Sequence, residues 1–137
     1  MISIAIVDSG PLLASANVAD PRHGSCLEAL QSPTYQLVIP ALCIAEVTYL
    51  LGRRKGPSAE SAFLRGLEQF DVQAPLPGEW SRVAHLVEQY EGMGLGGTDA
   101  SVVSLAERFK TDIILTLDHR HFRAIRPTHC DAFRLLP

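Results

Sequence analysis

The stretch SIAIVDSGP, residues 3–11, joins an apolar run to a carboxylate and to a helix start. Ser3–Val7 is rich in β-branched residues without polar alternation, which predicts a strand buried on both faces. Pro11 is suited to the first turn of a helix, so a short helix is expected over residues 11–16. Asp8 would then stand where a buried strand ends.

Apolar runs and helical patterns alternate along the rest of the chain. Residues 37–39 and 113–117 predict further buried strands, and residues 71–74 and 132–136 predict two shorter ones. Helices are expected at residues 22–31, 41–54, from 57 onward, 80–90 and 98–110. Strands separated by helices imply right-handed crossovers. The fold class is therefore α/β, with a mostly parallel sheet of four to five strands covered on both sides.

Two local patterns make sharper predictions about helices. Thr98 follows a glycine-rich loop, residues 92–97, and is expected to be the N-cap of the helix after it. The helix at residues 80–90 has a stripe predicted to face the core. That stripe contains Trp80, Val83, Ala84, Val87 and Tyr90.

Bulk properties are those of an ordinary globular domain. The 137 residues suffice for one domain with its own core, 47% are hydrophobic and the net charge is −3. That charge argues against binding to nucleic acid through bulk electrostatics alone. The three cysteines are widely spaced, which favours a reduced setting. The first apolar run is too short for a signal peptide, and no segment has the length of a membrane span. We therefore expect a cytoplasmic protein without membrane contact.

Four carboxylates lie at the end or in the middle of apolar segments. They are Asp8, Glu46, Asp99 and Asp118. A lone buried carboxylate is costly and is normally paired, hydrogen-bonded or bound to a metal ion. No matching buried Lys or Arg is evident. Because ligand sites of parallel sheets lie beyond the carboxyl ends of the strands, Asp8 and Asp118 are expected at that edge.

Each carboxylate also has an ordinary structural explanation. Asp8 could cap a helix, Asp118 could be a turn residue, and Asp99 could stabilise a helix dipole. Asp99 nevertheless shares its face with residues expected in the core. Glu46 has Leu42, Tyr49 and Leu50 as helical neighbours, so it is expected among apolar side chains unless that helix is less buried than its pattern suggests. A single metal site would account for all four acids together.

The ordered set of motifs resembles the PIN-domain family, and within it the VapC-type toxins of toxin–antitoxin pairs. The segments that carry the resemblance are Ile6-Val7-Asp8-Ser9, Ile44-Ala45-Glu46-Val47, Thr98-Asp99-Ala100 and Thr116-Leu117-Asp118-His119-Arg120-His121-Phe122. The resemblance covers essentially the whole chain and implies a single three-layer α/β/α domain over residues 1–137. A departure is the basic run after Asp118, which puts substrate preference in doubt more than chemistry.

The resemblance implies a metal-dependent endoribonuclease that acts on RNA, is inhibited by a small cognate antitoxin and forms homodimers. Asp8, Glu46, Asp99 and Asp118 match the family's acidic positions and are the predicted catalytic residues. Hard oxygen ligands favour Mg²⁺ or Mn²⁺. Asp8 and Asp99 rank first as direct ligands and Asp118 next, whereas Glu46 is expected to act through water or to orient the nucleophile.

Basic residues beside the acids are candidates for RNA binding. One group is Arg53, Arg54 and Lys55, and the other is His119 and Arg120 with His121 and Arg123. Either group could simply be solvated, and Arg53–Lys55 also suits a helix C-terminus. His119 or His121 is a candidate general acid. Two alternatives to a nuclease remain at this point: a non-catalytic PIN-like RNA- or partner-binding module, and a different Mg²⁺ phosphotransfer enzyme, which lacks its usual motifs here.

Overall fold

A five-stranded parallel sheet forms the centre of the protein, whose computed structural model describes residues 2–137. The strands are β1 (Ser3–Val7), β2 (Tyr35–Pro40), β3 (Asp71–Gln73), β4 (Ile113–Leu115) and β5 (Arg134–Leu136), in the spatial order β3-β2-β1-β4-β5. All four pairings are parallel. The predicted α/β class and parallel sheet are confirmed. From β1 the chain adds β2 and β3 on one side and then β4 and β5 on the other, so the strand order changes direction between β1 and β4.

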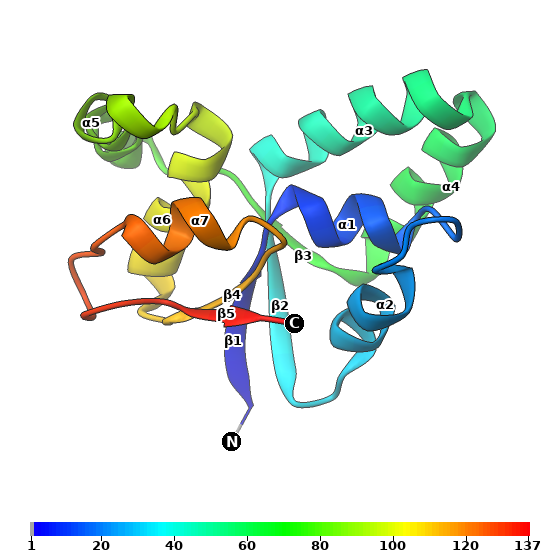
Figure 1. Cartoon of the computed structure of the whole chain (residues 1–137), viewed down its shortest axis with the longest axis horizontal. Helices are drawn as coiled ribbons and strands as arrows, with labels where there is room; N and C mark the ends of the chain where they lie inside the picture. Colours follow the sequence, from blue (N-terminus) through cyan, green and yellow to red (C-terminus); the bar gives the residue numbers. More distant parts are fainter. Residues whose placement is uncertain (1) are drawn as a thin grey trace.

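Helices cover both faces of the sheet. They are α1 (Ser9–Ser15), α2 (His23–Gln31), α3 (Ala41–Lys55), α4 (Pro57–Gly66), α5 (Trp80–Gln89), α6 (Gly97–Phe109) and α7 (His119–Ala124). Figure 1 shows α1, α2 and α4 on one side and α5, α6 and α7 on the other. Short 3-10 turns at Leu67–Gln69, Pro77–Glu79 and Glu91–Met93 join them. This three-layer arrangement gives the site its walls.

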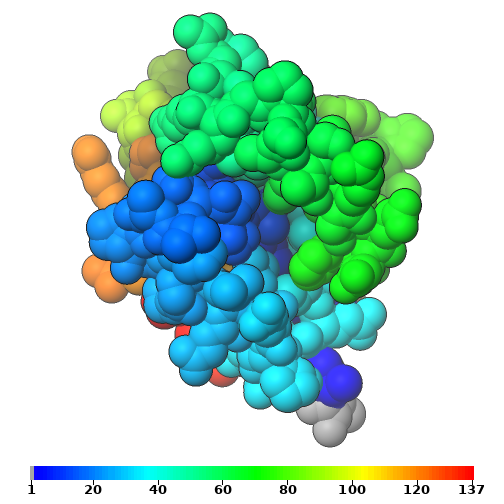
Figure 2. Space-filling model, turned by 90° about the vertical axis from the view of Figure 1, so that its right-hand side faces the viewer, coloured from blue at the N-terminus to red at the C-terminus, as the bar shows by residue number. Residues whose placement is uncertain are grey.

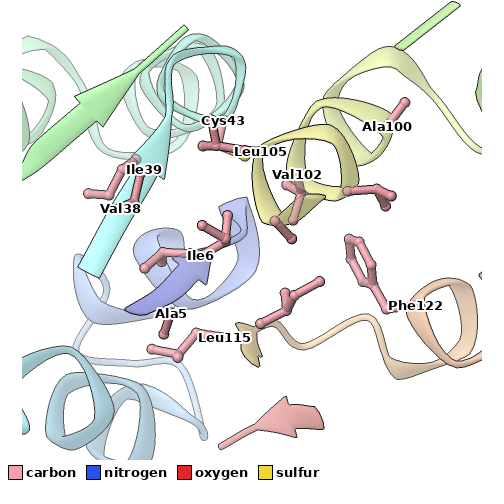
Figure 3. Close-up of a cluster of buried hydrophobic side chains, with 14 of the residues drawn as sticks. Ala5, Ile6, Val38, Ile39, Cys43, Ala100, Val102, Leu105, Leu115 and Phe122 are labelled. Atoms are coloured by element: carbon pink, nitrogen blue, oxygen red, sulfur yellow. The ribbon is translucent and has the colours of Figure 1, made fainter. Parts of the chain in front are cut away.

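The core lies where β1, β2 and β4 meet α6 (Figure 3). Ile6, Ile114 and Val102 are fully buried there. Phe122 of α7 is also fully buried and meets Phe133 edge to face, with ring centroids 6.4 Å apart. Because the central strands are covered on both faces, their sequences are continuously apolar, as the first run of the chain predicted.

The buried faces of α3 and α5 differ from the expected ones. Cys43, Val47 and Leu51 form the buried stripe of α3, so Glu46, one position before Val47, is exposed and not enclosed by apolar side chains. On α5 the buried residues are Val83 and Leu86, whereas Trp80 is 49% exposed and Ala84 is exposed. The periodicity was correct, but packing rotated each face by about one residue.

Several element boundaries also moved. Helix α1 begins at Ser9, directly after Asp8, and β4 ends at Leu115. Thr98 is not the N-cap of α6: Gly96 has the extended backbone of that position, and the helix begins at Gly97. Thr98 therefore lies in the first turn. Among residues 2–137 no helix is long and apolar enough to cross a membrane.

Candidate metal centre

A cavity of about 540 Å³ opens at the carboxyl ends of the strands and brings all four predicted acids together. Asp8, Glu46, Asp99 and Asp118 all line it, although they come from four separate parts of the chain. Gly94, Gly96 and Gly97 form part of its wall, where the absence of side chains leaves the acids accessible. The convergence that the sequence predicted is therefore present in the fold.

Asp8 is the most buried of these acids, with 5% of its surface exposed. It occupies the N-cap position of α1 but accepts no capping hydrogen bond there. Instead Thr116 Oγ1 donates to Asp8 Oδ2 at 2.8 Å, and Cys43 Sγ lies 3.9 Å from Asp8 Oδ1 as a weak donor. Burial raises the pKa of Asp8 to about 6, with Asp99 and Glu46 adding smaller repulsions.

Asp99 lies in the first turn of α6 and is half-buried. Burial is the main cause that raises its pKa, and the neighbouring Asp118 is the next. A favourable position at a helix N-terminus therefore does not compensate for desolvation and for a second carboxylate nearby. A cation placed between these carboxylates would relieve that repulsion.

Asp118 combines a structural contact with a place in the cavity. Its Oδ1 accepts the backbone N–H of His121 at 3.2 Å and so caps α7, as a simple turn residue would. Its Oδ2 lies 2.7 Å from His121 Nδ1, and Asp99 Oδ2 lies 3.3 Å from the same nitrogen. Asp99, Asp118 and His121 each have one potential metal-ligand atom, and these three atoms all lie within 4.8 Å of one another.

Thr116 connects Asp8 with Asp118. Its fully buried hydroxyl donates to Asp8 and accepts the backbone N–H of Asp118 at 2.9 Å. A single side chain thus fixes the Asp8 carboxylate and the turn that carries Asp118. Sequence reasoning missed Thr116, although a polar residue at the end of a buried strand is a usable signal.

The remaining predicted residues make none of the close contacts that join Asp8, Asp99 and Asp118 to their partners. Glu46 lines it as an exposed side chain. Arg53–Lys55 are exposed at the C-terminal end of α3, which runs away from α6 and α7 toward α4 (Figure 1). His119 lines a neighbouring pocket, and Arg120 is exposed on α7. Arg22, which was not predicted, lines both the acidic cavity and the pocket of His119.

The donor set fits a divalent cation. Carboxylate oxygens dominate, and they converge without a Lys or Arg among the residues that pair with Asp8, Asp99 or Asp118. A buried nitrogen, His121 Nδ1, faces two of these oxygens without a hydrogen-bond partner in residues 2–137. An ion held by Asp99 and Asp118, with Asp8 in the same cavity, would satisfy these atoms.

Comparison with known proteins agrees with this architecture. A model of the PIN domain matches residues 5–126. The ribonuclease VapC26 of Mycobacterium tuberculosis is 37% identical over 134 residues, which cover 96% of this chain and 99% of that protein. The chain belongs to the PIN-domain family, in its VapC branch. The match spans almost the full length of both proteins.

Solved structures share the fold at low sequence identity. VapC20 of M. tuberculosis, a toxin that cleaves the sarcin–ricin loop, superposes with a TM-score of 0.77 at 18% identity, over 85% of this PIN domain and 91% of that chain. VapBC2 of Rickettsia felis, bound to a DNA fragment from its promoter, gives 0.69 at 16% identity, over 98% and 99%. A toxin–antitoxin complex of Klebsiella pneumoniae gives 0.65 at 20% identity, over 88% and 92%.

Proposed function

We propose that this protein is a metal-dependent endoribonuclease and the toxin of a toxin–antitoxin pair. The observation that carries the proposal is the convergence of four carboxylates in one open cavity at the switch point of a parallel sheet. The 37% identity to a ribonuclease of the VapC type supports RNA as the substrate. Mg²⁺ or Mn²⁺ is the cofactor that suits these oxygen ligands.

Each residue has a distinct task in this reaction. Asp99 and Asp118 would hold the ion from the starts of two helices, and Asp8 would contribute its carboxylate from the end of β1. Thr116 keeps Asp8 oriented, and Glu46, an exposed side chain that lines the same cavity, would orient the attacking water. The ion supplies charge neutralisation at the phosphate and activation of water.

The decisive experiment is cleavage of a structured RNA by metal-free protein to which Mg²⁺ or Mn²⁺ is returned. Asp8→Asn and Asp99→Asn are expected to lower the cleavage rate by at least about 100-fold, because each removes charge where the phosphate and ion meet. Glu68→Gln, an exposed acid outside the cavity, is the matched control and should retain full activity.

Two outcomes contradict the proposal. Full activity in both Asp variants would show that cleavage does not depend on the cavity. Tight RNA binding without turnover in either metal would instead identify the protein as a binding module that kept the fold.

The expected antitoxin has a candidate docking surface in a second groove, which is partly lined by α1. An apolar groove of about 330 Å³ lies between α1 and α4, and Figure 2 shows the hollow between them. Leu12, Phe63 and Phe70 contribute to it. We propose that an apolar helical segment of the antitoxin fills this groove. Two of the similar structures are a toxin–antitoxin complex and a VapBC protein, which is consistent with such a partner.

The test of the partner begins with the reading frames next to this chain's gene and uses a small protein that one of them encodes. Ala62→Arg, in the groove, should abolish co-purification with it, whereas Ala84→Arg, exposed on α5, should not. Co-purification with both variants would place the antitoxin elsewhere. The predicted homodimer stays a prediction, to be measured by light scattering of the purified chain.

A further inference from the structure

His121 projects from the first turns of α7 toward the same oxygens that would hold the ion. Its Nδ1 lies 2.7 Å from Asp118 Oδ2 and 3.3 Å from Asp99 Oδ2, and its side chain is 20% exposed. The usual ligands of Mg²⁺ are oxygens, so a nitrogen at this position is an addition to the acidic set. Its chemistry is set by the hydrogen bonds of the ring.

The contact on the far side of the ring fixes the tautomer. His121 Nε2 lies 3.0 Å from the backbone carbonyl oxygen of Met93. A carbonyl oxygen only accepts, so Nε2–H is the donor and a neutral imidazole carries its lone pair on Nδ1. A histidine that donates its other N–H to a backbone carbonyl is the usual arrangement of a metal ligand, because that bond orients the ring.

The surroundings of Nδ1 suit a metal ion. Nδ1 is buried and has no hydrogen-bond partner in residues 2–137, although two carboxylate oxygens lie close to it. Those oxygens therefore lie off the axis along which Nδ1 would donate a proton. Adjacent ligands of an octahedral ion at about 2.1 Å are about 3.0 Å apart and lie about 45° off the nitrogen-to-metal direction. The two observed distances from Nδ1 to the carboxylate oxygens, 2.7 and 3.3 Å, lie on either side of this ligand-to-ligand distance.

We propose that His121 is a nitrogen ligand of the ion held by Asp99 and Asp118, and that it makes this site prefer Mn²⁺ to Mg²⁺. Imidazole is a ligand of transition-metal ions, whereas Mg²⁺ takes oxygen ligands and retains its water. This role of His121 rests on the proposed function, because the ion is the one bound at that same site. Through His121, α7 would contribute to the choice of metal.

The test measures coordination directly, without RNA. Mn²⁺ is added to metal-free wild-type protein, and pulsed electron paramagnetic resonance detects whether a ¹⁴N nucleus is coupled to the bound ion. We expect the coupling in wild type and in His85→Gln, a control exposed on α5, and its loss in His121→Gln. Wild type without nitrogen coupling, or coupling that persists in His121→Gln, would overturn the proposal.

Calorimetric titration provides the second readout. His121→Gln and His121→Asn are expected to bind Mn²⁺ at least about tenfold more weakly than wild type while their Mg²⁺ affinity changes by less than about threefold. Equal losses for both ions would overturn the claim about selectivity. RNA cleavage with Mn²⁺ bound but no nitrogen coupling would overturn the role of His121 alone, whereas Mn²⁺ binding with coupling but no cleavage would overturn the proposed function alone.

Discussion

Two opposing effects set the pKa of the Asp8 carboxyl group. Its burial disfavours the charged carboxylate, while Thr116 and the weaker thiol of Cys43 favour it by contact. Burial has the larger effect, which leaves the pKa at about 6. The metal-free protein consequently carries an electrostatic penalty at neutral pH, and a bound cation would remove it.

This raised pKa predicts how the stability of the metal-free protein depends on pH. The folded value of about 6 exceeds the model value of 3.8, so the folded state binds the proton more tightly. Stability is therefore lost as pH rises from about 4 to about 6 and stays low above that range. The difference between the two values corresponds to about 3 kcal/mol. Asp8→Asn should remove the part of this dependence that Asp8 causes.

Urea denaturation with a chelator at several pH values measures the effect. The Asp8→Asn variant should be more stable than wild type at pH 7 by up to about 3 kcal/mol, and this difference should shrink toward pH 4. Titrating groups that do not interact with Asp8 contribute equally to both proteins and cancel in the comparison, whereas Asp99 and Glu46 add a smaller change because they repel Asp8. A difference that stays constant with pH would contradict the assignment.

Arg22 is the basic residue that we expect to contact a bound RNA backbone. It lines the acidic cavity and the adjoining pocket of His119, whereas Arg54 lies exposed on the end of α3 that points away from α6 and α7. Arg22→Ala is expected to weaken RNA binding by about tenfold at low salt, and Arg54→Ala by less than about threefold. Fluorescence anisotropy in a chelator, which prevents cleavage, measures both. Equal losses would restore Arg53–Lys55 as a binding patch.

At the scale of elements, the short helix α7 depends on one aromatic anchor. Phe122 is fully buried between the sheet and Phe133, and it lies next to His121. Six residues are too few for a helix to be stable alone, so packing must hold α7 in place. The positions of Asp118 and His121 therefore depend on this contact.

Phe122→Ala is expected to lower the free energy of unfolding by about 3–5 kcal/mol, because it leaves a cavity in the core. Arg123→Ala, at the exposed position that follows, should change it by less than about 0.5 kcal/mol. Urea unfolding monitored by circular dichroism compares the two variants. A loss below about 1 kcal/mol in Phe122→Ala would mean that α7 is held by other contacts.

On the scale of the whole molecule, the site joins parts of the chain that are far apart in sequence. Asp8 follows β1, Asp99 opens α6 on the other side of the sheet, and Asp118 precedes α7. An ion bound among them links the central strand to two helices. Binding to the folded state alone raises stability by about 2.7 kcal/mol when free ion exceeds Kd by 100-fold.

Thermal unfolding should report this linkage. Wild-type protein is expected to gain several degrees in Tm with saturating Mn²⁺, while Asp99→Asn should be at least as stable without metal and gain much less with it. Glu88→Gln, an exposed acid on α5, should respond as wild type does. Equal shifts in all three proteins would argue against Asp99 as a ligand.

Local sequence pattern was sufficient to predict the order of strands and helices, the α/β class and which four acids line the cavity. Each of these features depends mainly on neighbouring residues in the sequence. The first buried strand and Asp8 at its end are the clearest example. Periodicity did not determine which face of α3 or α5 is buried. Tyr49 and Trp80 are 61% and 49% exposed, since neighbouring elements decide which edge of an apolar stripe they cover.

Local sequence pattern places four carboxylates at the ends of apolar runs or within them, and the parallel topology that it predicts brings strand ends to one edge. Packing then decided which of these acids is buried, since Asp8 is and Glu46 is not, and which other groups join them. Thr116 hydrogen-bonds Asp8 across 108 residues of chain, Arg22 lines the cavity from the segment between α1 and α2, and His121 of α7 approaches Asp99 of α6. Such contacts depend on how elements pack in three dimensions, and no spacing along the chain encodes them.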